Sequence, residues 1–296
     1  MIYLESFHFP SREEDENFFI SYPGNPHFKT KNFRTIYQTK YPFELFRDRE
    51  LPDRFEFRDI TVFCGDNGSG KSTILNVISE TLGLHRGTPF NRSDFFEDYT
   101  ELCRYSVREK IPQRSRIITS DDVFSRVMNI RRLNAGIDDK RQEMIDEYIA
   151  LRGDDADTAL HGLDDYERWS KTHDARKKSG SQSQYLRARL VRNVEERSNG
   201  ESALAFFAES IEDGGLYLLD EPENSLSVQH QLDLKYYLQD AVKHHVCQFI
   251  LSTHSPFLLS LMNARIYDLD SVPPVIRRYD DLECIRVYRE FFAGNL

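Results

Sequence analysis

The segment GDNGSGKST combines closely spaced glycines with a lysine and two hydroxyl residues, a pattern that can hold phosphate groups. It contains the spacing G-x-x-x-x-G-K-S that defines a P-loop. Glycines let backbone N–H groups surround phosphate oxygens, and the dipole of a following helix favours their negative charge. Lys71 can place a positive charge between the β- and γ-phosphates, while the Ser72 hydroxyl can coordinate Mg²⁺. The segment therefore predicts nucleotide binding by Gly65, Asp66, Asn67, Gly68, Ser69, Gly70, Lys71, Ser72 and Thr73.

Two adjacent carboxylates follow an apolar run in LYLLDEPE, residues 216–223. The run predicts a buried strand, and the ligand sites of open α/β sheets lie at the carboxyl ends of such strands. Asp220 would then hold Mg²⁺, and Glu221 would polarise the attacking water as a general base. The alternative is that both residues merely open a turn before Pro222. Adjacent carboxylates at the end of a buried strand are unusual without a cation nearby, which favours the catalytic interpretation.

A histidine follows a third apolar run, QFILSTHSP at residues 248–256. A lone histidine usually has a structural role. The end of a central strand should lie beside the phosphates, however, so we expect His254 to make a hydrogen bond to the γ-phosphate and to take part in catalysis.

The stretch ERSNGES places a small polar cluster directly before the apolar residues of a helix. Ser198 and Glu201 fit the S-x-x-E capping box. In this motif the serine side chain accepts a hydrogen bond from the backbone N–H of the glutamate, and the glutamate side chain accepts one from the backbone N–H of the serine. A capped helix start also presents free N–H groups and the positive end of a dipole, which can bind a phosphate. The residues alone leave both interpretations open.

Three short apolar runs predict the strands that position these groups, at 60–65, 216–220 and 248–253. Helical patterns follow them, so the alternation predicts an α/β fold with a parallel sheet. The N-terminal stretches MIYLESFHF and RFEFRDITVF alternate like half-exposed strands and predict an antiparallel flank. The helices expected after the three strands cover residues 70–83, 227–243 and 256–262.

Charge density rises between residues 85 and 197, and this part predicts a mainly helical lobe inserted into the α/β core. It lacks long heptad tracts, which argues against an extended coiled coil. The resulting division is 1–84, 85–197 and 198–296. Candidate helices in the lobe lie near residues 121–132, 138–151, 160–171 and 184–195.

Composition describes a folded chain of 296 residues with 39% hydrophobic and 30% charged residues. No apolar run approaches the roughly 20 residues that a membrane helix needs, and the N-terminus lacks a secretion signal. The four scattered cysteines fit reduced thiols, so we expect a cytoplasmic protein without membrane insertion. The net charge of −10 disfavours a globally basic nucleic-acid surface, although eight basic and three acidic residues between Lys171 and Arg197 give a local charge of +5.

Taken together, the motifs resemble those of ABC-type ATPases. The P-loop matches Walker A, Asp220 and Glu221 match Walker B with its catalytic glutamate, and His254 matches the switch histidine. Asp220 follows Ser198 by 22 residues and precedes His254 by 34, close to the ABC pattern. The chain is similar to bacterial stand-alone predicted ATPases, described as AAA family ATPases, in YPF, RSNGES, GLYLLDEPENSLS and the ending ARIYDLD…VYREFF. The signature motif is Ser198, Asn199, Gly200 and Glu201, and the D-loop contains Asn224 and Ser225.

The resemblance implies a homodimer that binds and hydrolyses two ATP molecules with Mg²⁺, each held between the P-loop of one copy and the signature of the other. ATP binding would close the dimer and hydrolysis would open it, a conformational switch for DNA-related or defence work with another soluble protein. Nucleic acid is a further candidate partner, supported only by the basic segment. An ATP-binding subunit of a membrane transporter is the first alternative, disfavoured by the 127 positions between Lys71 and Ser198. An ATP-gated, non-catalytic module that binds an effector protein is the second.

Several positions depart from the family pattern. No Q-loop glutamine is evident, and Asp121 is the candidate that replaces it through a water molecule. Ser227 stands at the last D-loop position in place of aspartate, and Asn199 replaces the first signature glycine. The aromatic residue that stacks on adenine is not assigned, and its candidates are Tyr37, Tyr41 and Phe43.

Overall fold

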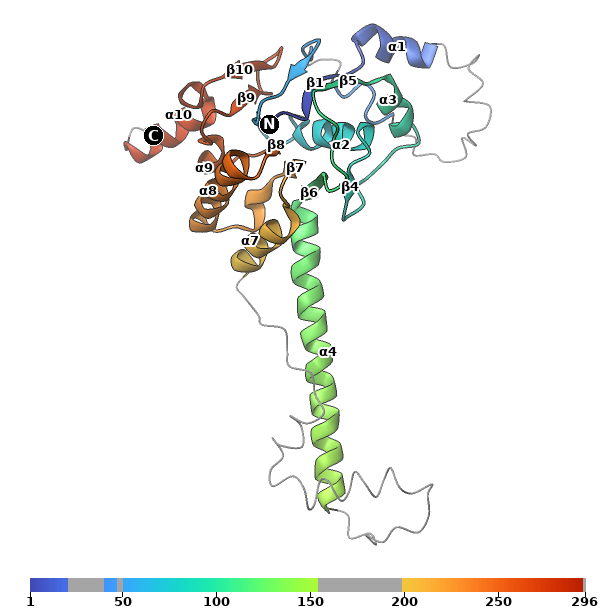
Figure 1. The fold of residues 1–296 in the computed structure, drawn as a ribbon, viewed down its shortest axis with the longest axis vertical. Coiled ribbons are helices and arrows are strands. Elements are labelled where there is room, and N and C mark those ends of the chain that lie inside the picture. Colours follow the sequence, from blue (N-terminus) through green and yellow to red (C-terminus); the bar gives the residue numbers. More distant parts are fainter. Residues whose placement is uncertain (21–39, 47–49, 154–198, 295–296) are drawn as a thin grey trace. The chain divides into compact units, whose positions relative to one another are not determined.

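The computed structural model describes residues 1–20, 40–46, 50–153 and 199–294 (Figure 1). The chain divides into two compact units. The first consists of Met1–Ser125 and Asn199–Leu296, and it contains every strand described below. In the second, Arg126–Ser198, the described residues are the helical ones up to Gly153.

A seven-stranded sheet forms the centre of the first unit, with the order β10-β9-β3-β8-β7-β6-β4. Its strands pair in parallel except for β10, which runs antiparallel to β9. The predicted parallel core is therefore confirmed. The strands are β3 (Ile60–Cys64), β4 (His85–Arg86), β6 (Arg116–Thr119), β7 (Gly215–Asp220), β8 (Cys247–Ser252), β9 (Arg265–Asp268) and β10 (Val275–Arg277).

Both faces of this sheet are buried, which explains the uninterrupted apolar runs of its central strands. In β7, Leu216 and Leu218 contribute to one hydrophobic core, while Tyr217 and Leu219 contribute to the other. Helix α2 (Lys71–Thr81) packs into the first core. The second core is covered by α7 (Asn199–Ser210), α8 (Val228–His244), α9 (Pro256–Leu259) and α10 (Glu283–Phe292).

A three-stranded antiparallel sheet with the order β2-β1-β5 confirms the predicted N-terminal flank. Gln248 of β8 joins the two sheets although it is fully buried. Its Oε1 accepts hydrogen bonds from the N–H groups of Tyr3 at 2.8 Å and Leu4 at 2.9 Å, and its Nε2 donates to the Leu4 and Arg58 carbonyls. Because all its polar atoms are paired, burying this amide carries no desolvation penalty from unmade bonds. The strands are β1 (Leu4–His8), β2 (Phe55–Glu56) and β5 (Arg104–Val107).

The predicted boundary at residue 85 differs from the structure, because residues 85–125 belong to the first unit. Strands β4 and β6 extend the central sheet, and β5 completes the flank. These strands have only two to four residues, too few for a clear periodic signal. The other elements of this unit are α1 (Arg12–Ile20), α3 (Phe96–Leu102) and the 3₁₀ helices η6 (Pro222–Ser225) and η7 (Tyr279–Asp281).

One helix, α4 (Ser120–Gly153), replaces the two helices predicted at 121–132 and 138–151. Between these segments the only helix breaker is Gly136, and a single glycine costs a helix about 1 kcal/mol, too little to end it. The helices predicted at 160–171 and 184–195 lie outside the described residues. Among the residues that the structure describes, no helix has the length and apolar character needed to cross a membrane.

Candidate active site

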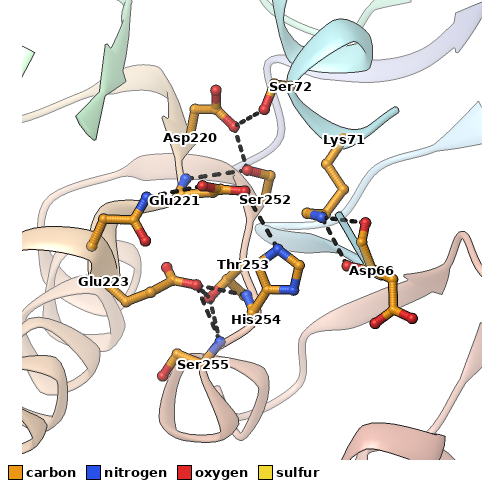
Figure 2. A network of polar contacts seen from close by, with 12 residues as sticks. Asp66, Lys71, Ser72, Asp220, Glu221, Glu223, Ser252, Thr253, His254 and Ser255 are labelled. Atoms are coloured by element: carbon orange, nitrogen blue, oxygen red, sulfur yellow. Dashed lines mark hydrogen bonds and ion pairs between the residues drawn. The ribbon is translucent and has the colours of Figure 1, made fainter. Parts of the chain in front are cut away.

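The P-loop connects the end of β3 to the first turn of α2, as the sequence predicts. Lys71 lies in this turn with its side chain folded back over the loop, where Nζ donates to the Gly65 carbonyl at 2.7 Å and the Asp66 carbonyl at 3.0 Å (Figure 2). Burial lowers the pKa of Lys71, while the nearby Glu221 carboxylate opposes that effect. A buried ammonium held only by carbonyl oxygens is suited to receive an anion.

Gly70 ends the loop with φ of 95°, in the left-handed region that favours glycine. A Cβ atom at this position would also lie 2.7 Å from Cε1 of the Phe46 ring. Phe46 is buried, so the ring has little room to move away. The P-loop is thus braced by an aromatic side chain that the sequence did not single out, because no local pattern links it to residue 70.

Asp220 ends β7 and faces the first turn of α2. Its Oδ1 accepts hydrogen bonds from the Ser72 Oγ at 3.0 Å and the Ser252 Oγ at 2.5 Å (Figure 2). Burial raises the pKa of Asp220, an effect that these two hydroxyl groups partly offset.

The donor set of Asp220 and Ser72 fits Mg²⁺, which binds to one or two carboxylates and completes its shell with substrate phosphates and water. No group of three or more histidine, cysteine, aspartate or glutamate side chains among the described residues could form a metal site by itself. These two residues would therefore hold the ion together with a bound nucleotide.

Glu221 follows Asp220 with φ of 47°, a left-handed conformation that is uncommon for glutamate. Its N–H donates to the Ser252 carbonyl at 3.1 Å, and Asn224 Nδ2 donates to its Oε2 at 2.9 Å. Oε1 lies 3.4 Å from Nε2 of His254 (Figure 2). The turn therefore brings the predicted base and the predicted switch histidine together, from strands β7 and β8, at the sheet edge that carries Lys71.

A match to the family described as ABC transporter covers residues 54–224, more than half of the chain. The chain belongs to the ABC transporter family. It has the P-loop fold of ABC-type ATPases, as its motifs predict.

Curated relatives of this ABC-type chain include the uncharacterized ABC transporter ATP-binding protein YfmM of Bacillus subtilis (strain 168). It is 26% identical over 238 residues, which are 76% of this chain and 43% of YfmM. The hemin import ATP-binding protein HmuV of Rhodopseudomonas palustris (strain HaA2) is 30% identical over 183 residues, 60% of this chain and 58% of HmuV. The chain spans about half the length of the curated relatives it matches.

Two solved structures are also similar to parts of this chain. One is the Smc head domain of Pyrococcus furiosus with an extended coiled coil, bound to the C-terminal domain of ScpA, with a TM-score of 0.37, 13% identity and coverage of 81% of this chain and 95% of that one. The other is the dimeric ATP-binding cassette MJ0796 in a post-hydrolysis state bound to ADP and Pi, with a TM-score of 0.35, 14% identity and coverage of 77% and 90%.

Of the residues predicted to form the signature, Asn199, Gly200 and Glu201 open helix α7, which begins at Asn199. Ser198 lies outside the described residues, so its capping contact with Glu201 stays a prediction. The sequence predicts that the apolar residues after this polar cluster belong to a helix. In α7 two of them, Ala203 and Phe207, are fully buried in the second core.

The predicted D-loop residues Asn224 and Ser225 lie in η6, and Ser227 directly precedes α8. The Ser227 Oγ accepts a hydrogen bond from the His230 N–H at 3.3 Å and caps this helix. Serine and aspartate are both favoured helix caps, so a serine at this position keeps the structural role that an aspartate would have.

A cavity of about 690 Å³ lies beside Asp220 and Ser72 in this ABC-type site. Asp121, the candidate replacement for the Q-loop glutamine, lines it together with Tyr41. Arg86 lines it too, donating to Asn76 Oδ1, and sequence reasoning missed this cation because nothing in its neighbourhood forms a motif.

The three aromatic candidates for adenine stacking in this ABC-type chain have different positions. Tyr41 lines the cavity, and its hydroxyl group donates to Thr73 Oγ1 of the P-loop at 3.1 Å. Phe43 is a core residue, 3% exposed and stacked on Phe18, so it does not face a ligand. Tyr37 lies outside the described residues.

Proposed function

We propose that this chain hydrolyses ATP with Mg²⁺ at the sheet edge that carries the P-loop, Asp220, Glu221 and His254. The observation that supports this best is the 3.4 Å distance between Glu221 Oε1 and His254 Nε2. This contact lies directly beside the Asp220 carboxylate, which accepts a hydrogen bond from Ser72. The proposed base and the proposed cation-binding carboxylate lie at the end of β7, the proposed switch histidine follows β8, and Ser72 lies in α2. Hydrolysis needs these groups together.

Each residue has a separate role in this proposal. The P-loop amides and the Lys71 ammonium bind the phosphates, and Asp220 with Ser72 holds the Mg²⁺ ion, which neutralises phosphate charge when bound. Glu221 accepts a proton from the attacking water. His254 donates from Nε2 to a γ-phosphate oxygen and thereby stabilises the charge that develops on it.

A second copy of the chain would complete each site. The start of α7, with Ser198, Asn199, Gly200 and Glu201, offers N–H groups and a positive dipole end to a γ-phosphate. Placed against the P-loop of a partner copy, it would close a homodimer over two ATP molecules. Opening after hydrolysis then makes the dimer a conformational switch.

Glu221→Gln tests the assignment of the base. The amide keeps the size of the side chain but cannot accept the proton, so turnover should fall by at least about a hundredfold. Phosphate release measures turnover, and titration with a fluorescent ATP analogue measures affinity, which should be unchanged because Lys71 and the P-loop amides are intact. Turnover of this variant at the wild-type rate would show that another group is the base.

The names of the curated relatives favour a second candidate, the ATP-binding subunit of a transporter. This candidate requires a membrane-embedded partner. Affinity capture of the Glu221→Gln protein from detergent-solubilised membranes of the source cells discriminates between the two. An integral membrane protein retained in stoichiometric amount would favour the transporter, and a homodimer without one would favour a stand-alone ATPase.

Work on DNA, including defence work, rests on the basic segment between Lys171 and Arg197, which lies outside the described residues. An electrophoretic shift with and without ATP, repeated across a salt series, tests it. Binding through phosphate contacts must weaken as salt rises. Absent or salt-insensitive binding would remove DNA as a partner and leave an effector protein as the target of the switch.

A further inference from the structure

Glu223 takes no part in the proposed hydrolysis, yet its carboxylate accepts more hydrogen bonds than that of Glu221. Its Oε1 accepts from the Thr253 Oγ1 at 2.7 Å, the His254 N–H at 2.6 Å and the Ser255 N–H at 3.2 Å (Figure 2). All three donors belong to the loop that leaves β8 and carries the switch histidine. One oxygen atom of Glu223 thus holds three consecutive residues.

The turn that contains Glu223 also holds Glu221. The Asn224 N–H donates to the Glu221 carbonyl at 3.2 Å, and the Asn224 side chain donates to the Glu221 carboxylate. The Leu226 N–H donates to the Glu223 carbonyl at 2.9 Å. One short turn therefore fixes the catalytic carboxylate at one end and the histidine loop at the other.

The far side of the histidine loop has a different anchor. Ser255 caps α9 by accepting from the Phe257 N–H at 3.2 Å, and its hydroxyl donates to Gln231 Oε1 of α8 at 2.7 Å. On the near side, the His254 N–H finds its partner in Glu223. Without that carboxylate, the backbone of His254 would lose its anchor, and its side chain would no longer be held in the position proposed for contact with the γ-phosphate.

We propose that Glu223 is a positioning residue that holds His254 at its distance from Glu221 for ATP hydrolysis. The inference rests on the proposed function of this site. It assigns Glu223 no contact with the nucleotide. Its effect on the reaction passes through the backbone of the histidine loop.

The chemistry of the contact calls for an acceptor and does not require a negative charge. The second oxygen, Oε2, is buried without a hydrogen-bond partner, so an amide nitrogen in its place would break no bond. Burial also raises the pKa of Glu223, which means that its surroundings disfavour the charged form. Glutamine at position 223 should therefore preserve the positioning of His254, whereas alanine should not.

The test compares Glu223→Ala with Glu223→Gln in steady-state ATP hydrolysis. The alanine variant should lose about tenfold or more in kcat with KM for ATP within about threefold, because a misplaced catalytic group impairs the reaction more than binding. The glutamine variant should stay within about threefold of the wild-type kcat. The matched control, Glu97→Ala, removes an exposed glutamate from α3 and should leave both constants unchanged.

Hydrogen exchange gives a second measurement that does not depend on turnover. The amides of His254 and Ser255 should exchange faster in Glu223→Ala and at the wild-type rate in Glu223→Gln. If the alanine variant does not fold, Thr253→Val serves instead. It removes one donor of the three and should lower kcat about twofold to fivefold, with a smaller rise in exchange.

Two results would overturn the proposal while the wild type is active: full kcat in Glu223→Ala, or an equal loss in Glu223→Gln. Absence of ATP turnover in the wild-type protein would instead refute the proposed function itself. The two failures are thereby distinguished.

Discussion

The half-buried carboxylate of Asp220 at the end of β7 shows how a single residue can lower the stability of the protein in favour of its function. Burial raises the pKa of Asp220, so the charged form that would hold Mg²⁺ is the form that the apo protein disfavours. Two hydroxyl groups, of Ser72 and Ser252, reduce this penalty without removing it. The same environment strengthens the attraction for a cation once one is bound.

Asp220→Asn should therefore stabilise the nucleotide-free protein and abolish hydrolysis. A folded-state pKa above the unfolded one gives stability that is present at low pH and is lost as pH rises through the folded pKa. Asparagine does not titrate, so its advantage should grow from acidic to neutral pH. Thermal unfolding in chelator should give a Tm about 2 °C or more above wild type at pH 8 and a smaller gap at pH 5. A lower Tm at every pH would contradict this reasoning.

Sequence reasoning at this scale succeeds where the chemistry lies in contiguous motifs. Lys71 and Asp220 could be assigned because a glycine-rich loop and an apolar run precede them. Glu223 and Phe46 could not be assigned, since Glu223 contacts the backbone of His254, 31 positions away, and Phe46 contacts Gly70, 24 positions away. The amino-acid types at those positions carry no sign of such contacts.

At the scale of elements, the central strands were predictable because both their faces are buried, which gives uninterrupted apolar runs. The helices that follow them were predictable because each has one apolar face, which gives a periodic pattern. The short edge strands were not. Strand β4 has two residues, and its pairing with β6 depends on a neighbour 31 positions away, His85 against Arg116. Tertiary contacts decide such elements, and local periodicity does not.

The C-terminal helix α10 packs beside the strand that leads into the P-loop. Ile285 is buried, and the Sγ of Cys284 lies 3.9 Å from the Sγ of Cys64, the last residue of β3. The hydrogen bond between the thiols lowers the pKa of Cys284, which is the more exposed of the two. The two sulfur atoms are thus close enough to be joined by small side-chain rotations.

Mild oxidation with copper–phenanthroline should join Cys64 to Cys284 and leave Cys103 and Cys247 reduced. Peptide mapping identifies the bond, and the large loop that it closes should raise the Tm by several degrees. Cys284→Ser is the control and should show neither effect. A bond that involves Cys103 or Cys247, or none at all, would contradict this packing of α10.

At the scale of the whole molecule, each proposed ATP site requires two copies of the chain. A net charge of −10 on each chain opposes their association, and a physiological salt concentration screens that repulsion beyond about 8 Å. ATP between the copies would supply the attraction. The sequence suggests this arrangement only through its resemblance to ABC-type ATPases, in which the signature of one copy faces the P-loop of the other.

Mixing two inactive variants tests this central claim most directly. Lys71→Ala lacks phosphate binding but keeps the signature, and Ser198→Arg keeps the P-loop but blocks the signature. Neither should hydrolyse ATP alone. Their equimolar mixture at 0.15 M salt should recover about one quarter of wild-type turnover per chain, because half of random dimers are mixed and each has one intact site of two. No recovery in the mixture, or full activity of Ser198→Arg by itself, would contradict a site shared between two copies.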